Sequence, residues 1–370
     1  MPTRRQLLTS AAALAATSPL IAAPNLIGYA EDPEADIIGH GDFRYRANPH
    51  WAKVNPFKTH INNCHEMVEA SGGRLFMVGD DPRNNVIVFN KDGEVVDQWG
   101  TQFPGGHGLT ISPEGDEEYL YITESGWATD PNRGYVTKNE GWVTKMTLDG
   151  RVVFMLGHPM TQGAYTPEMS FMPTEVAVGP NGDLYVADGY GSSYILQYNH
   201  RGEFIRKFGG KNNADPRYNL DEAHGVAIDY RDPGNPKVVV TSRQDAAFKY
   251  FTLDGQYLSQ TDLANYFVCR PVLRGDNLFA GVCWSHEERE GEWWLKHSGF
   301  VTVLDKDDRV VSNPGGTAPE YRDGKLLKAA RNERKTFYHG HDVCPLGTGD
   351  MVVCQWNAYH TPPVFLERVE

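Results

Sequence analysis

The chain has 370 residues, of which 40% are hydrophobic and 22% are charged, and its formal net charge is −13 at pH 7. This excess of acidic residues argues against nucleic acid or an anionic membrane as a partner, because both select basic surfaces. The hydrophobic content suffices for one compact core, and no linker, low-complexity tract or charge block divides the chain. We therefore expect a single globular domain that is a monomer.

The first 30 residues have the composition of an export leader. Residues 3–8 read TRRQLL, and an Ala-rich apolar run follows from Ala11 to Ala23. Paired arginines before such a run are typical of a twin-arginine export signal, and the run is short for a membrane span. We predict a leader over 1–30, cleaved near Ala23 or a few residues later, and a domain over 31–370. The mature protein would be periplasmic or secreted without membrane contact; an uncleaved disordered or anchoring N-terminus is the alternative.

Short apolar β-strands recur through the rest of the chain, and no long segment has helical periodicity. Val, Ile, Tyr and Phe dominate these strands, and Gly in the turns between them supplies the positive φ of a tight hairpin. Six such units predict an all-β fold, a six-bladed β-propeller of four-stranded antiparallel blades. The recurring strands are 74–78, 118–122, 183–187, 237–240, 277–280 and 350–353, and the turns are Asp92-Gly93, Asp149-Gly150, Arg201-Gly202 and Asp254-Gly255.

The last of the six units lacks an outer strand. It shows only three strands, which begin at Asp342, Asp350 and Pro363. Residues 41–46 near the N-terminus alternate aromatic and basic residues and could supply the fourth strand. Because pairing of the two ends removes exposed strand edges, we predict that the N-terminal strand closes the ring.

Three histidines, His107, His224 and His341, lie at equal spacings of 117 residues and begin similar apolar segments. Alternate blades of a six-bladed ring are about 120° apart, so these imidazoles would converge on the central axis. Three histidines with an open fourth position form the ligand set of a catalytic zinc site, although imidazole also suits iron and cobalt. The residues that open the first strand of each unit, and so face the channel, are His65, His107, Thr174, His224, Arg270 and His341.

The five cysteines leave two interpretations open. Cys269 with Cys283, and Cys344 with Cys354, each straddle a strand-turn-strand unit. In an oxidising periplasm these pairs could form cross-strand disulfides, and buried free thiols are the alternative. Cys64, beside His65, has no counterpart.

Residues 162–210 resemble an NHL repeat through the segments PTEVAV at 173–178 and VADGYGSSYILQY at 186–198. More narrowly, the chain from about Ser71 to its C-terminus resembles the peptidyl-α-hydroxyglycine α-amidating lyases, which are six-bladed propellers. The resemblance implies zinc ligands at His107, His224 and His341, a catalytic tyrosine at Tyr190, an active-site arginine at Arg243, and a structural calcium bound partly by the carbonyl of Leu109 and the carboxylate of Asp342.

The activity implied by this resemblance is zinc-assisted cleavage of the C–N bond of a carbinolamide. Tyr190 would be the base, and Arg243 would bind the carboxylate of a small or short peptide-like substrate. The chain departs from the family where a second arginine is expected near residues 78–80; Arg83 is the nearest candidate. It also has His339 in place of a methionine, and Gly191 in place of the cysteine of the animal enzymes.

Two alternative functions follow from these departures and from the fold. His65 and His339 could carry protons in a related metal-dependent hydrolase of the lactonase or esterase type. A non-catalytic NHL propeller that binds protein or peptidoglycan is the other alternative, because fold alone does not decide function. Such a scaffold would have no need of three histidines on alternate blades.

Overall fold

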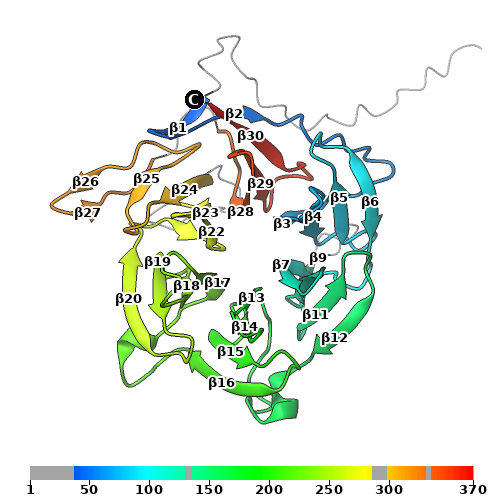
Figure 1. The fold of residues 1–370 in the computed structure, drawn as a ribbon, viewed down its shortest axis with the longest axis vertical. Helices are drawn as coiled ribbons and strands as arrows, with labels where there is room; N and C mark the ends of the chain where they lie inside the picture. Colours follow the sequence, from blue (N-terminus) through cyan, green and yellow to red (C-terminus); the bar gives the residue numbers. More distant parts are fainter. Residues whose placement is uncertain (1–36, 130–135, 286–297, 331–334, 370) are drawn as a thin grey trace, which may run out of the picture.

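The computed structural model describes residues 37–369 except 130–135, 286–297 and 331–334, so the predicted leader lies outside the described residues. Six antiparallel sheets surround a central axis, which confirms the predicted six-bladed propeller (Figure 1). In the described part of the chain, helix is limited to two 3₁₀ turns, η1 (Pro159–Gln162) and η2 (Pro216–Tyr218). No helix there is long and apolar enough to cross a membrane.

Blades 1 to 4 each begin with the inner strand and proceed outward along the chain. Blade 1 contains β3 (Cys64–Glu69), β4 (Leu75–Gly79), β5 (Val86–Phe89) and β6 (Val95–Trp99). Blade 2 contains β7 (Gly106–Glu114), β8 (Glu117–Glu124), β11 (Trp142–Thr147) and β12 (Val152–Leu156). Blade 3 contains β13 (Glu175–Val178), β14 (Leu184–Ala187), β15 (Tyr194–Tyr198) and β16 (Phe204–Gly209). Blade 4 contains β17 (Ala223–Asp229), β18 (Lys237–Ser242), β19 (Ala247–Phe251) and β20 (Tyr257–Asp262).

Blade 5 has a divided inner strand. Its members are β21 (Phe267–Val268), β22 (Val272–Arg274), β23 (Asn277–Trp284), β24 (Phe300–Leu304) and β25 (Val310–Ser312), and both β21 and β22 pair with β23. Arg270 lies in the break between β21 and β22. Two small hairpins lie outside the blades, β9 (Trp127–Thr129) with β10 (Val136–Lys138) and β26 (Tyr321–Arg322) with β27 (Lys325–Leu326).

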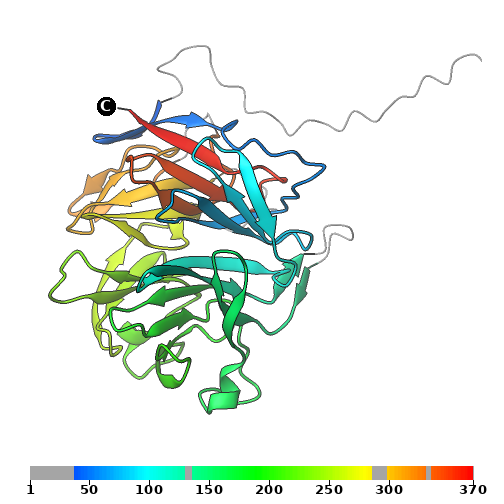
Figure 2. The same cartoon turned by 45° about the vertical axis from the view of Figure 1, so that its right-hand side comes forward.

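Blade 6 joins the two ends of the chain, as predicted. It consists of β28 (Gly340–Pro345), β29 (Met351–Gln355), β30 (Val364–Val369), β2 (Phe43–Asn48) and β1 (Ile37–His40), of which β1 is an additional fifth strand. The pairing of β2 with β30 runs from Arg44 opposite Val369 to Asn48 opposite Phe365. Figure 2 shows the N-terminal strands lying along the C-terminal strand at one edge of the ring. The described N- and C-terminal strands therefore close the circle.

The hydrophobic core lies between neighbouring blades. Val238 and Val240 of β18, for example, share one buried cluster with Ala177 of β13 and Tyr185 of β14. The second strands β14 and β18 are buried on both faces, so their sequences are nearly continuous apolar runs rather than an alternating pattern. The Asp-Gly turns between outer strands form as predicted: Gly93 has φ +76°, and a Cβ there would lie 2.0 Å from the carbonyl oxygen of Trp51.

Candidate functional site

Four histidines lie at irregularities near the start of the inner strands. The register shifts between Cys64 and Glu66 in β3, between Gly106 and Leu109 in β7, between Ala223 and Val226 in β17, and between Gly340 and Asp342 in β28. A bulge re-aims the side chain that it contains, and the bulged residues include His65, His107, His224 and His341. A bulge repeated in four blades therefore directs the four histidines.

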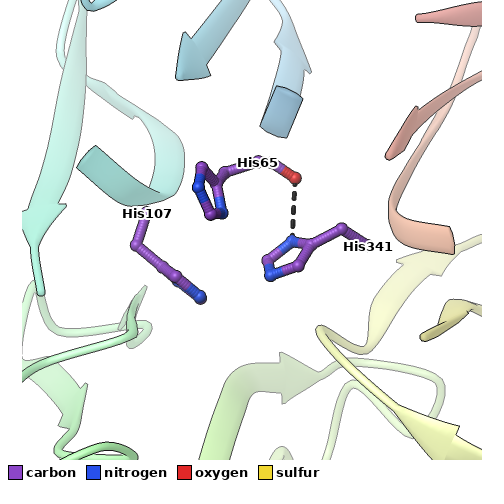
Figure 3. A group of neighbouring side chains, drawn as sticks. All are labelled: His65, His107 and His341. Atoms are coloured by element: carbon purple, nitrogen blue, oxygen red, sulfur yellow. Dashed lines mark hydrogen bonds between the residues drawn. The ribbon is translucent and has the colours of Figure 1, made fainter. Parts of the chain in front are cut away.

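The predicted convergence of His107, His224 and His341 is present in the structure. Their ring centroids are 4.7 Å (His107 to His341), 4.8 Å (His107 to His224) and 5.2 Å (His224 to His341) apart. His65 joins them, at 4.9 Å from both His107 and His341, and Figure 3 shows three of these rings around a common space. Two sets of buried ligand atoms lie within 4.8 Å of one another, His65 with His107 and His341, and His224 with Cys269 and His341.

Backbone carbonyls orient two of the rings. The Nδ1 atom of His107 lies 2.8 Å from the carbonyl oxygen of Thr174, and Nδ1 of His341 lies 3.0 Å from that of His65 (Figure 3). Contacts of this kind fix the ring and leave Nε2 as the ligand atom, as is usual for metal-binding histidines. Nε2 of His341 and Nδ1 of His224 are buried and have no hydrogen-bond partner in the described part of the chain.

All three rings are suited to binding a cation. Burial is the main cause that lowers the pKa of His107, His224 and His341 well below 6.5, with further lowering by neighbouring histidines and Arg243. They are therefore neutral at neutral pH, the form that binds a metal. The structure contains a histidine-based site that fits a transition metal ion, because its donors are convergent, neutral and partly without other partners.

Tyr190 lies between two of these histidines. Its hydroxyl is 3.1 Å from Nε2 of both His107 and His224, and Nη2 of Arg243 lies 3.4 Å away. The loop that carries Tyr190 follows β14 and is held by Asp188, whose carboxylate accepts hydrogen bonds from Met172, Ser192 and Tyr165. Burial raises the pKa of the Tyr190 phenol, and the charge of Arg243 opposes that rise.

Arg243 is buried at the end of β18 and is paired with an acidic group. Its Nη2 donates to the carboxylate of Glu222, which also accepts a hydrogen bond from Gln244. Its guanidinium lies 5.1 Å from the ring centroid of Trp284. The structure thus brings Tyr190 and Arg243 to the histidines, as the sequence predicts, and adds Glu222 as a counterion.

Asp80 lies where the family resemblance predicts a second active-site arginine. Asp80 follows β4, and its Oδ2 lies 3.4 Å from Nε2 of His65. The Asp80 carboxylate also accepts hydrogen bonds from the backbone and side chain of Asn63 at 2.9 and 2.8 Å. Arg83 pairs instead with Asp81 at 2.7 Å, and it is not among the described residues that line the central cavity.

Most of these groups line one cavity of about 780 Å³, whereas His224 and Cys269 are not among the described residues of its lining. The lining combines aromatic side chains with charged and polar groups, a composition typical of small-molecule sites. The lining includes Asn62, Asn63, His65, Asp80, His107, Trp127, Tyr190, Lys211, Glu222, Arg243, Gln244, Trp284, His341, Trp356 and Tyr359. His339, a candidate proton carrier, is absent from the described lining; it is fully buried, with Nδ1 2.7 Å from the carbonyl oxygen of Cys283.

Leu109 and Asp342, the candidate calcium ligands, lie in a separate buried cluster. The carbonyl oxygen of Leu109 accepts a hydrogen bond from Nη1 of Arg270 at 2.6 Å, and the carboxylate of Asp342 accepts from Nε and Nη2 of the same guanidinium at 3.0 and 2.9 Å. These groups do not fit a calcium ion, because a side-chain cation already occupies their acceptor positions. All five cysteines are buried free thiols, so neither candidate disulfide is formed.

The chain is similar in sequence to several curated proteins. It is 31% identical over 121 residues to a probable peptidyl-α-hydroxyglycine α-amidating lyase of Caenorhabditis elegans, a match that covers 32% of this chain and 30% of that protein. It is 32% identical over 139 residues to peptidyl-α-hydroxyglycine α-amidating lyase 1 of Drosophila melanogaster, covering 37% of this chain and 23% of that protein. Human NHL repeat-containing protein 3 is 24% identical over 240 residues, covering 58% of this chain and 65% of that protein.

These matches confirm the resemblance seen in the motifs, and they span a third or less of the length of the lyases. No family model matches the chain. Among solved structures, an inactive virginiamycin B lyase from Staphylococcus aureus with quinupristin has a TM-score of 0.51 at 12% identity, covering 83% of this chain and 95% of that one. A gluconolactonase from Xanthomonas campestris has a TM-score of 0.51 at 12% identity, and the match covers 92% of this chain and 93% of that one. At this identity both show the fold alone.

Three residues of the site are absent from the sequence-based prediction. Glu222 stands two residues before His224, as His339 stands two before His341, and this shared offset was the available signal. Asp80 stands where the family resemblance expects an arginine, and its pairing with His65 depends on the bulge in β3. Cys269 comes from blade 5 and stands directly before Arg270, as Cys64 stands directly before His65, and this shared offset was the available signal.

Proposed function

We propose that this protein is a metal-dependent lyase, with zinc as the metal, that cleaves the C–N bond of a carbinolamide. The observation that carries the proposal is the position of the Tyr190 hydroxyl, 3.1 Å from Nε2 of both His107 and His224 and beside Arg243. A non-catalytic propeller has no need of a phenol placed between converging neutral imidazoles. The partial matches to amidating lyases support the same reaction class.

His107, His224 and His341 would hold the zinc ion. Their ligand atoms belong to two sets that share His341, one with His65 and His107 and the other with His224 and Cys269, so His65 or Cys269 would be within reach as a further ligand. When bound, zinc supplies Lewis-acid polarisation that makes a substrate hydroxyl more acidic. Tyr190 would accept the proton from that hydroxyl. As the hydroxyl oxygen forms a C=O bond, the C–N bond breaks, and the nitrogen leaves with a proton as an amide.

Arg243 has two roles in this proposal. Burial raises the pKa of Tyr190, and the charge of Arg243 opposes that rise, which favours the phenolate, the form of Tyr190 that can accept a proton. Arg243 lines the cavity, so its guanidinium would also bind a substrate carboxylate there. Arg243 already forms an ion pair with Glu222, so a substrate carboxylate would bind a guanidinium that is also bound to Glu222.

The test combines metal analysis with turnover of α-hydroxyhippurate. We expect one equivalent of a transition metal in the purified protein, little in His224→Ala, and release of benzamide and glyoxylate by the parent only. A parent protein that binds no transition metal would contradict the metal site. A metal-loaded protein that releases no glyoxylate would contradict the lyase reaction and leave the site intact.

A metal-dependent hydrolase of the lactonase or esterase type is the second candidate, and one observation favours it. Asp80 lies 3.4 Å from His65 in the cavity, where the amidating lyases are expected to carry an arginine. A carboxylate paired with an imidazole can accept a proton from an attacking water molecule. Turnover of a lactone or an ester without glyoxylate release, lost in Asp80→Asn, would identify this reaction instead.

The proposal also covers where in the cell the protein acts and what kind of substrate it binds. The twin-arginine sequence at Arg4 and Arg5 supports export to the periplasm or the exterior, and the cavity size suits a small molecule or a short peptide-like substrate. Fractionation of cells that express the full chain tests the location: protein retained in the cytoplasm would contradict it.

A further inference from the structure

Arg270 places a guanidinium on the propeller axis, in contact with oxygen atoms of three other blades. Nε and Nη2 donate to the two carboxylate oxygens of Asp342 at 3.0 and 2.9 Å. Nη1 donates to the carbonyl oxygen of Leu109 at 2.6 Å, and Nη2 also donates to that of Met67 at 3.1 Å. Arg270 is 7% exposed, so these contacts are made out of water.

Two further carboxylates face the same guanidinium. Oε2 of Glu66 lies 3.1 Å from Nη1 of Arg270, and Oε2 of Glu175 lies 3.8 Å from Nε. Both glutamates are almost completely buried. Burial raises the pKa of Glu66 well above 4.5, and so does the neighbouring carboxyl group of Glu175, with which Glu66 shares a hydrogen bond. Three carboxylates and two carbonyl oxygens thus surround one buried positive charge. Without that charge their mutual repulsion and desolvation would be uncompensated.

The groups around Arg270 come from the inner strands that carry the histidines. Glu66 follows His65 in β3, Leu109 is two residues after His107 in β7, and Asp342 follows His341 in β28. Glu175 begins β13 of blade 3, and Arg270 itself belongs to blade 5. One side chain therefore connects five blades directly beside the cluster of imidazoles.

We infer that Arg270 is a built-in structural cation, which replaces a divalent ion on the axis and positions the strands that present His65, His107 and His341. An all-oxygen set of carboxylates and carbonyls is what calcium prefers, and calcium needs 6–8 oxygen ligands at about 2.3–2.6 Å. The guanidinium already uses both oxygens of Asp342 and the carbonyls of Leu109 and Met67. The protein consequently requires no calcium at its axis. This inference is independent of the reaction that the cavity performs.

The first test uses the wild-type protein, so it does not depend on a variant that folds. Melting temperature is measured at constant zinc with and without millimolar CaCl2, and retained calcium is measured by mass spectrometry after dialysis. We expect an unchanged melting temperature and no retained calcium. One equivalent of retained calcium, or a melting temperature that rises with CaCl2, would overturn the inference.

The second test removes the built-in cation. Arg270→Ala leaves the oxygen cluster without its charge and with space for an ion, so it should melt at a lower temperature than wild type. CaCl2 should restore most of that loss, since a bound ion at a hundred times its Kd shifts the folding equilibrium about a hundredfold. MgCl2 should restore less, because Mg²⁺ demands a near-ideal octahedral site.

The matched control is Arg270→Ala/Asp342→Asn, which lacks the central carboxylate and should gain no stability from CaCl2. Calcium that stabilises both variants equally, or neither, would refute the assignment of this cluster as a cation site. The positioning role is tested with cobalt bound at the histidine site in place of zinc. The visible absorption spectrum of cobalt-loaded Arg270→Ala should differ from that of the cobalt-loaded wild type, and addition of CaCl2 should restore the wild-type spectrum. An unaltered cobalt spectrum in Arg270→Ala would refute the positioning role.

Discussion

Removal of the Tyr190 hydroxyl separates a catalytic role of this residue from a structural one. Tyr190→Phe keeps the ring, which packs 5.2 Å from Trp127 and 5.2 Å from His107 between centroids, and deletes only the group that contacts two imidazoles and Arg243. A general base contributes about 10²–10⁴-fold to a rate, so kcat should fall by that factor, or about 3–5 kcal/mol of barrier. Because Phe replaces no metal ligand, metal content should not change.

The same substitution has a smaller effect on stability. The hydroxyl makes two hydrogen bonds of 3.1 Å to neutral imidazoles in the metal-free protein. Each is worth about 1 kcal/mol net, so the free energy of unfolding should fall by about 1–3 kcal/mol in urea titrations. A loss of activity in the metal-loaded protein much larger than this loss of stability is the signature of a catalytic hydroxyl.

Tyr198 provides the matched control. It is buried, in β15 of blade 3, and its hydroxyl has no hydrogen-bond partner in the described part of the chain. Tyr198→Phe should therefore leave activity and metal content unchanged and should not lower stability. Full activity in Tyr190→Phe, or an equal loss in both variants, would refute the assignment of Tyr190 as the base.

Three further predictions concern other parts of the molecule. Because burial keeps the pKa of His107, His224 and His341 below 6.5, the unfolded chain binds protons that the folded metal-free protein does not. Stability should be full above pH about 6.5 and fall below it by up to about 1.4 kcal/mol per pH unit for each histidine, with a shallower slope in His224→Gln. A chain that begins at Pro49 lacks β1 and β2, exposes the edge of β30, and should aggregate, whereas one that begins at Ile37 should stay monomeric by size-exclusion chromatography. Asp80→Asn should slow a hydrolytic reaction without loss of metal, which kinetics and metal analysis would check together.

The sequence determined the fold and most of the candidate site. Apolar strands at regular intervals, with Gly-containing turns between them, specify four-stranded units whatever their neighbours are, and six units fix a six-bladed ring. Equal spacing then places His107, His224 and His341 on alternate blades, because the same structural repeat returns each residue to the same place. Tyr190 and Arg243 came from the family resemblance, and each follows the second strand of its blade.

Only the tertiary structure decided which groups share a contact. Arg270 opens an inner strand like the histidines, so the sequence placed it beside them, yet its partners Asp342, Leu109 and Met67 are 72, 161 and 203 residues away. Its direction depends on the break between β21 and β22 and on the bulges in β7 and β28, which no local pattern announces. The pairings of His65 with Asp80 and of Arg243 with Glu222 likewise depend on where side chains point after a bulge or a loop. Periodicity fixes the order of the strands, whereas the direction of a buried charge is set by the oxygen atoms that distant strands bring to it.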